Sequence, residues 1–274
     1  MKVVITAAVV GAEVMRQHSP HIPYTAAEIA QAGSKASAAG AAVLHLHARE
    51  TDGRPSQKSE HFRRIIQELH ALRCQAILQV STGGAVGMSI DERLGSLVPE
   101  AEMATLNLGS MNFGDGVFEN REPDIITIAE RIRQAGLIPE CEVYDAGHLD
   151  SLRRLRDQGH LPENYHVQFV LGVRGGIDAS EEDLRFLVDK LHRFEPNSPW
   201  SVAGIGRHQF PMAELALRWG GHVRVGLEDN LYVRKGELAE GSHQLVGLVA
   251  EMAQREGRTV ATISEAREMF GLSP

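Results

Sequence analysis

Short apolar runs alternate along the chain with longer segments in which apolar and polar residues follow a helical period. This alternation predicts a parallel β-sheet whose strands are connected by crossover helices. Eight strands and eight helices indicate a closed (β/α)8 TIM barrel, and 274 residues suit a single barrel domain over residues 1–274. The predicted strands are residues 3–10, 42–47, 76–80, 102–108, 138–143, 166–171, 200–205 and 222–227. The predicted helices lie near residues 26–38, 58–72, 89–97, 123–135, 147–158, 180–192, 210–219 and 240–256.

Residues at the starts of the predicted helices support these boundaries. Thr25 and Glu28 have the spacing of a capping box, and Ser180 precedes three acidic residues, which favour the positive end of a helix dipole. The main alternative fold is an open, doubly wound sheet. That fold needs a Gly-rich turn after its first strand, whereas residues 11–13 read Gly-Ala-Glu.

The composition excludes several classes of protein. A hydrophobic content of 43% argues against disorder, and a formal net charge of −8 without a block of basic residues argues against nucleic-acid binding. Two distant cysteines, Cys74 and Cys141, fit a reduced, cytoplasmic setting. No apolar stretch is long enough to span a bilayer. Because Glu13 and Arg16 close the first apolar run, we interpret it as a strand and not as a signal peptide.

The second predicted strand ends in a series of polar residues. Residues 43–49 read Val-Leu-His-Leu-His-Ala-Arg. Successive side chains of a strand point to opposite faces, so His45, His47 and Arg49 should share one face. Two adjacent imidazoles are costly to bury unless something binds them, and a metal ion is the obvious candidate. Hydrogen bonding inside the barrel is the alternative role for the two histidines.

Polar residues also end most other predicted strands, which is where barrel enzymes carry their chemistry. On the eighth strand Arg224, Gly226 and Glu228 should share a face, with Gly226 leaving space for a ligand. Glu228 could complete a site with the two histidines, because two imidazoles and one carboxylate form a common catalytic zinc set that also suits iron(II). A buried ion pair between Arg224 and Glu228 is the alternative. The other strand ends carry Glu13, Ser81, Thr105, Asn107, Glu140 and Glu142.

Several motifs together resemble those of the β-keto acid cleavage enzymes, along essentially the whole chain. They are the segment ending at Glu13, residues 23–30, His-Leu-His-Ala-Arg at 45–49 with Asp-Gly at 52–53, Ser-Thr-Gly-Gly at 81–84, Asn-Leu-Gly-Ser-Met-Asn-Phe at 107–113 and Gly-Leu-Glu-Asp-Asn at 226–230. The resemblance implies a TIM barrel, usually a homotetramer, with zinc held by His45, His47 and Glu228. It also implies a reaction of a β-keto acid with acetyl-CoA, which yields acetoacetate and the CoA thioester of the remaining acyl fragment.

The resemblance further assigns catalytic roles. Asp229 matches the catalytic base of the family and Arg224 matches its partner, while Glu142 is expected to orient Arg224 through a bidentate pair. Because Glu228 and Asp229 are adjacent, we expect the chain to turn there so that both side chains face the site.

Other matched positions concern the substrates. Ser81, Gly84 and Thr105 match residues that hold the substrate, and Glu13 matches a residue that meets a substrate amino group, which its charge would favour.

The sequence does not reveal a CoA site. Arg174 and Arg207 on the strand-end loops are candidates for contacts with its phosphates. Two other functions stay open: a metal-dependent aldolase or hydrolase of keto acids that needs no CoA, and a non-catalytic barrel that binds a small acid.

Overall fold

The computed structural model describes residues 1–196 and 198–273, and at its centre is a closed barrel of parallel strands. The predicted TIM-barrel fold is confirmed. The doubly wound alternative is excluded because the last barrel strand pairs with the first and closes the sheet. In spatial order the barrel strands are β2 (Ile5–Ala8), β3 (Val43–Leu46), β6 (Ile77–Val80), β7 (Met103–Asn107), β10 (Ile138–Val143), β11 (His166–Leu171), β12 (Trp200–Gly204) and β13 (His222–Val225).

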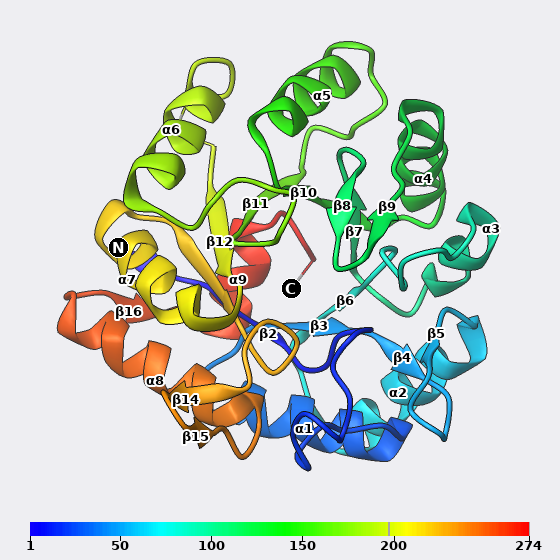
Figure 1. Ribbon diagram of the computed structural model, residues 1–274, viewed down its shortest axis with the longest axis vertical. Helices are drawn as coiled ribbons and strands as arrows, with labels where there is room; N and C mark the ends of the chain where they lie inside the picture. The colour runs from blue at the N-terminus through cyan, green and yellow to red at the C-terminus, as the bar shows by residue number, and fades with distance from the viewer. Residues whose placement is uncertain (197, 274) are drawn as a thin grey trace.

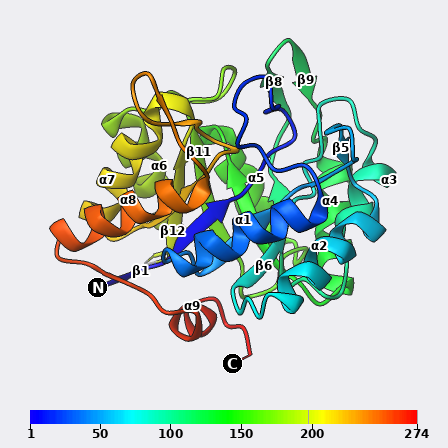
Figure 2. The same cartoon turned by 90° about the horizontal axis from the view of Figure 1, so that it is seen from below.

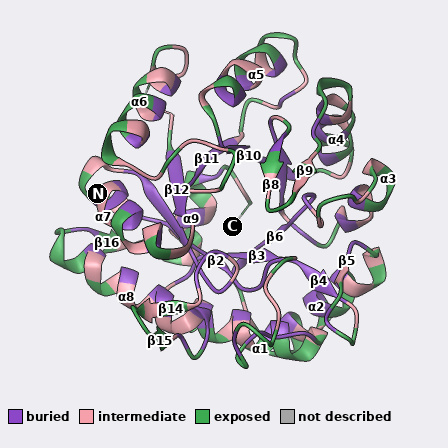
Figure 3. Cartoon of the chain, in the orientation of Figure 1, coloured by how far each residue is buried: buried purple, intermediate pink, exposed green. Residues whose placement is uncertain are grey.

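The helices that follow these strands form a ring around the barrel (Figure 1). Their boundaries lie within two residues of the prediction, and the capping box of Thr25 and Glu28 is present. Each helix turns buried residues toward the barrel and exposed residues outward (Figure 3). The ring consists of α1 (Ala26–Ala38), α2 (Ser59–Ala71), α4 (Glu122–Gln134), α5 (Ala146–Asp157), α6 (Glu181–His192), α7 (Gln209–Trp219) and α8 (Ser242–Arg255).

The amino-terminal end of the barrel is closed by chain segments from both halves of the sequence. The predicted first strand is divided: β1 (Lys2–Val3) pairs with β16 (Thr259–Val260) beneath the barrel, and only β2 belongs to the barrel itself. Helix α9 (Ile263–Met269), which the sequence pattern did not predict, lies under the same end (Figure 2). Phe270 packs there with apolar residues of the strand beginnings, among them Val4, Val43, Ile77 and Met103.

Short elements follow the barrel strands at the opposite, carboxyl-terminal end. The hairpin of β8 (Met111–Phe113) and β9 (Gly116–Phe118) lies far from α9 (Figure 2). The helix predicted at residues 89–97 is only one α-helical turn, α3 (Ile90–Arg93), followed by a 3-10 turn, η1 (Leu94–Ser96). The remaining short pairs are β4 (Ala48–Arg49) with β5 (Pro55–Ser56), and β14 (Tyr232–Arg234) with β15 (Glu237–Leu238).

Candidate active site

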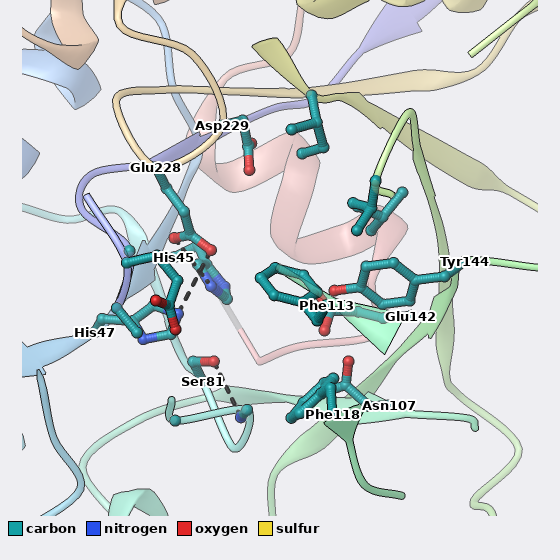
Figure 4. A pocket seen from close by; sticks show the side chains of 18 of the residues that line it. His45, His47, Ser81, Asn107, Phe113, Phe118, Glu142, Tyr144, Glu228 and Asp229 are labelled. Atoms are coloured by element: carbon teal, nitrogen blue, oxygen red, sulfur yellow. Dashed lines mark hydrogen bonds and ion pairs between the residues drawn. The ribbon is translucent and has the colours of Figure 1, made fainter. Parts of the chain in front are cut away.

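A pocket opens at the carboxyl ends of the barrel strands, where polar residues gather in the sequence (Figure 4). His45, His47 and Glu228 lie on one side of it, and Glu142 and Tyr144 lie on the other. The pocket is also lined by Gly11, Glu13, Ser81, Gly84, Asn107, Phe113, Phe118, Arg224 and Asp229.

His45, His47 and Glu228 each bring one potential ligand atom to the same point. These atoms lie within 4.8 Å of one another. Nε2 of His45 is 3.5 Å from Oε2 of Glu228, and Nε2 of His47 is 3.5 Å from Oε1 of the same carboxylate. The three side chains that the sequence placed in one candidate metal site therefore meet in space.

Three observations show that this group fits a bound divalent cation. Oε2 of Glu228 is buried and has no hydrogen-bond partner among the described residues. Nδ1 of His45 donates to Oε1 of Gln79 at 2.7 Å, which leaves the Nε2 lone pair facing Glu228. Burial raises the pKa of Glu228, but neighbouring charge, above all the Arg224 guanidinium, outweighs burial and holds that pKa well below its usual value. An ionised, unpaired carboxylate oxygen beside two imidazoles is an arrangement that a metal ion completes.

Two glycines allow Glu228 to reach this position. A side chain at Gly226 would collide with the main-chain carbonyl of Ala8 on the neighbouring strand β2. The interpretation that Gly226 leaves space for a ligand is therefore wrong, because the neighbouring main chain occupies that space. A Cβ atom at Gly11 would lie 2.5 Å from Cγ of Glu228. Both glycines are needed for close packing around the Glu228 side chain.

Arg224 is the centre of a buried charge cluster beside the histidines. Its Nε and Nη2 donate to the two oxygens of Asp229 at 3.0 and 2.9 Å. Nη2 also donates to Oε1 of Glu228 at 2.6 Å, and Nη1 donates to Oε1 of Glu142 at 3.2 Å. The bidentate partner of Arg224 is thus Asp229, and the prediction that it is Glu142 is wrong. The expected turn after β13 is present, with Asp229 N–H donating to the Gly226 carbonyl, and it brings Asp229 alongside the guanidinium.

The buried carboxyl groups of this cluster have perturbed acidities. Burial raises the pKa of Asp229 and of Glu142, and Arg224 opposes the rise in both. Three carboxyl groups surround one guanidinium, so the cluster has an excess of negative charge when all of them are ionised. A divalent cation beside Glu228 would balance that excess.

The family model described as β-keto acid cleavage enzyme matches residues 2–272. The chain belongs to this family. It is 46% identical over 273 residues to the 3-keto-5-aminohexanoate cleavage enzyme of Acetoanaerobium sticklandii, with 99% of both chains covered. It is 36% identical over 270 residues to the 3-oxoadipate:acetyl-CoA acetyltransferase of Cupriavidus necator, covering 98% of this chain and 94% of that one.

The fold is also similar to a solved structure. The ternary complex of ObcA with a C4-CoA adduct and oxalate superposes with a TM-score of 0.82 and 23% identity, covering 93% of this chain and 68% of that chain. This likeness supports the barrel fold. Among the described residues, no helix combines the length and apolarity that crossing a membrane requires.

Of the family positions expected to hold substrate, Glu13, Ser81 and Gly84 line the pocket, and Thr105 does not. Oγ1 of Thr105 accepts a hydrogen bond from Thr82 N–H at 3.1 Å, and the Thr105 carbonyl accepts one from the Thr82 hydroxyl at 2.7 Å. In this family member Thr105 therefore fixes the loop that follows β6. Its direct contact with substrate stays a prediction.

Part of the pocket wall comes from residues that the sequence pattern did not single out. Phe113 and Phe118, on the two strands of the β8–β9 hairpin, pack edge to face with ring centroids 6.1 Å apart. The buried guanidinium of Arg93 lies 4.9 Å from the Phe118 ring centroid and donates to the carbonyls of Thr82 and Glu119. Arg93 thereby connects the hairpin to the loop after β6. Strands of three residues are too short to show a period in the sequence.

Arg49, the last residue of the polar series after the second strand, does not line the pocket. Its Nη1 donates to the Gly53 carbonyl at 2.6 Å, and its Nη2 donates to the carbonyls of Val14, at 2.6 Å, and Gly11. The expected shared face with the histidines does not extend to Arg49, because β3 ends at Leu46 and Arg49 belongs to the separate strand β4. Arg49 fixes the loop between β2 and α1, which carries Glu13 to the pocket.

The two arginines considered for CoA phosphates, Arg174 and Arg207, are exposed on the loops after β11 and β12. Neither lines the pocket, so their contact with CoA stays a prediction.

Proposed function

We propose that this protein is a zinc-dependent β-keto acid cleavage enzyme. It would condense a β-keto acid with acetyl-CoA and release acetoacetate and the acyl-CoA of the remaining fragment. The observation that carries the proposal is the convergence of His45, His47 and Glu228 with the Arg224–Asp229 pair in one pocket of a chain that belongs to this family. The name of the Cupriavidus necator relative includes acetyl-CoA, which agrees with the proposed co-substrate.

His45, His47 and Glu228 would hold the zinc ion, and Gln79 would orient His45 through its Nδ1. Two imidazoles and one carboxylate leave a coordination position open for substrate. When bound, the zinc ion would supply Lewis acidity that polarises the carbonyl and carboxylate oxygens of a β-keto acid.

Asp229 would act as the base that takes a proton from the carbon between the keto and carboxylate groups. Both of its oxygens accept hydrogen bonds from Arg224, which fixes the carboxylate plane, and each oxygen keeps a lone pair for the proton. Because burial raises the pKa of Asp229, the carboxyl group can retain the proton that it takes. The deprotonated carbon then forms a bond to the carbonyl carbon of acetyl-CoA. Transfer of CoA to the other acyl group and cleavage of the original carbon–carbon bond release acetoacetate.

We propose that the substrate tail carries a cationic group. Glu13 lines the pocket and would attract such a group by charge complementarity. Phe113, Phe118 and Val173 line the same pocket and would pack against the carbon atoms of the tail. An amino-substituted tail also agrees with the name of the Acetoanaerobium sticklandii relative.

A coupled assay on purified protein of known metal content tests this function. The substrates are β-keto acids with amino, carboxylate or alkyl tails, each offered with and without acetyl-CoA, and mass spectrometry detects acetoacetate and new acyl-CoA. We expect acyl-CoA only when both substrates are present. Cleavage without acetyl-CoA would instead support the aldolase or hydrolase alternative.

Two variants test the assigned roles in the same assay. Glu13→Gln should raise KM for the amino-tailed substrate, because the variant loses the negative charge that attracts the ammonium group. KM for the alkyl-tailed substrate should stay unchanged, because that tail carries no charge. His47→Ala should lose both bound metal and turnover. Full activity in metal-free His47→Ala protein would contradict the mechanism.

The family resemblance also leads us to propose a homotetramer, and the cysteine content leads us to propose a cytoplasmic location. Cys74 and Cys141 are both free thiols in the structure, which agrees with a reducing compartment. Light scattering coupled to size exclusion would test the tetramer, and a fully active monomer would contradict it.

A further inference from the structure

Asn107 is a buried residue whose polar atoms have no partner. It is the last residue of β7 and is only 1% exposed, yet neither Nδ2 nor Oδ1 makes a hydrogen bond to any described residue. Buried amide groups are almost always paired, so an unpaired one needs an explanation. Asn107 lines the pocket, and Figure 4 shows its side chain directed into it, on the side away from His45 and His47.

The surroundings of Asn107 keep its amide in this position. Its strand neighbour in register is Glu142 on β10, whose carboxylate is already bonded to Arg224. On the other side lies Gly83, where even a Cβ atom would be 3.7 Å from the Asn107 amide nitrogen. Figure 4 draws the amide oxygen toward the pocket. Because neither amide atom has a partner among the described residues, a flip of the amide group turns Nδ2 to the pocket without breaking any existing hydrogen bond.

Tyr144 adds a second neutral donor to the same wall. Its main chain is held on both sides: the N–H donates to Nδ1 of His148 at 3.2 Å, and the carbonyl accepts from Ile177 N–H at 2.8 Å. The hydroxyl points into the pocket (Figure 4) and makes no hydrogen bond to another described residue. The wall opposite the histidines therefore carries uncharged donors without protein partners, as an oxyanion site requires.

We infer that the Asn107 amide is an oxyanion donor that binds the thioester carbonyl oxygen of acetyl-CoA. This inference rests on the proposed function. When the deprotonated carbon bonds to the thioester carbonyl carbon, the π electron pair of that carbonyl moves onto its oxygen, and Nδ2–H stabilises the charge without transferring a proton. The β-keto acid is assigned to the side of the pocket with His45, His47 and Glu228, so the thioester faces the opposite wall, where Asn107 lies.

Asn107→Leu tests this role because leucine has a similar volume and no polar atoms. Removing groups that have no partner should leave the protein as stable as the wild type or more stable. Loss of one oxyanion donor should lower kcat for acyl-CoA formation about 10²- to 10³-fold. Proton removal precedes the use of this donor, so protein-catalysed deuterium exchange at the α-carbon of the β-keto acid in D2O should persist.

Asn120→Leu is the matched control. Asn120 is also a buried asparagine, but its Nδ2 donates to the Gly109 carbonyl and its Oδ1 accepts from Arg93. Its replacement should therefore destabilise the protein. A loss of stability in Asn107→Leu as large as in Asn120→Leu, or unchanged kcat in Asn107→Leu, would overturn the inference.

Asn107→Asp gives a second measurement, since it keeps the shape but removes the donor. It should also lose turnover, and wild-type turnover in this variant would again overturn the inference. A wild-type protein without acetyl-CoA-dependent product would contradict the proposed function itself, whereas an active wild type with an equally active Asn107→Leu variant would contradict only the role of Asn107.

Discussion

Replacing Arg224 by methionine should destabilise the protein more than the loss of a single hydrogen bond would, because the substitution leaves several buried carboxylates without their cation. The side chains of Arg224 and Asp229 are each 3% exposed, and that of Glu142 is 6% exposed, so solvent screens these charges little. Removing one partner of a buried ion pair typically costs about 3–5 kcal/mol. We expect a loss in this range for Arg224→Met, and a larger loss in metal-free than in metal-loaded protein.

The expected loss of unfolding free energy corresponds to a measurable decrease in melting temperature. With an unfolding entropy of about 2.1 cal/mol/K per residue, a chain of 274 residues has roughly 0.6 kcal/mol/K, so Tm should fall by roughly 5–9 °C. Circular dichroism in urea gives the free energy of unfolding, and thermal melts give Tm. Both are measured after chelation and after metal loading.

A double-mutant cycle with Asp229→Asn tests whether the cost arises from the buried pair itself. Hydrogen bonds to charged groups contribute about 1.5–3 kcal/mol, so adding Asp229→Asn to Arg224→Met should recover energy of that order. The double variant would then be less destabilised than the sum of the two single variants. Strict additivity, or a loss below about 1 kcal/mol for Arg224→Met in metal-free protein, would refute this account of the charge cluster.

Three other predictions concern separate parts of the structure. Gln79→Leu should weaken metal binding about 10- to 100-fold in a chelator competition assay, because it removes the hydrogen bond that orients His45; unchanged affinity would argue against that role. Burial lowers the pKa of His166 to about 3, so below its unfolded pKa of 6.5 the unfolded chain takes up a proton that the folded protein does not. Stability should therefore fall with decreasing pH, and His166→Gln should remove up to about 1.4 kcal/mol per pH unit of that slope between the unfolded pKa of 6.5 and the folded pKa of about 3; an identical slope would contradict the shift. Gly226→Ala should lower both Tm and metal content, since the new methyl group collides with β2 and displaces Glu228; normal metal content would show that the strand adapts.

The barrel could be predicted from the sequence because its strands are buried on both faces and appear as continuous apolar runs. The starts of the helices could also be predicted from the sequence, because a capping residue bonds to main-chain groups only a few residues away. Helix α9 and the β8–β9 hairpin were not predicted, because seven helical residues and strands of three residues are too short to establish a period.

The convergence of His45, His47 and Glu228 could also be predicted, because strand alternation and strand-end position follow from local geometry. The partner of Arg224 could not. Whether Asp229 or Glu142 forms the bidentate pair depends on how the chain turns after Gly226 and how far β10 extends toward it. The lack of hydrogen-bond partners for Asn107 could not be predicted from the sequence either, because it depends on every residue around the amide and not on the local sequence.

The hydrogen bonds of Arg49 have a consequence for how this protein tolerates mutation. Arg49 binds the loop after β2 on both sides of Glu13, through the main-chain carbonyls of Gly11 and Val14. Every amino acid supplies a main-chain carbonyl, so a mutation at residue 12 or 13 can change the side chain that lines the pocket while Arg49 still holds the loop. His45, His47 and Glu228 stand on other segments, so such a mutation leaves them in place. A single substitution in this loop can therefore alter the part of the pocket that Glu13 lines without removing the contacts that hold the loop.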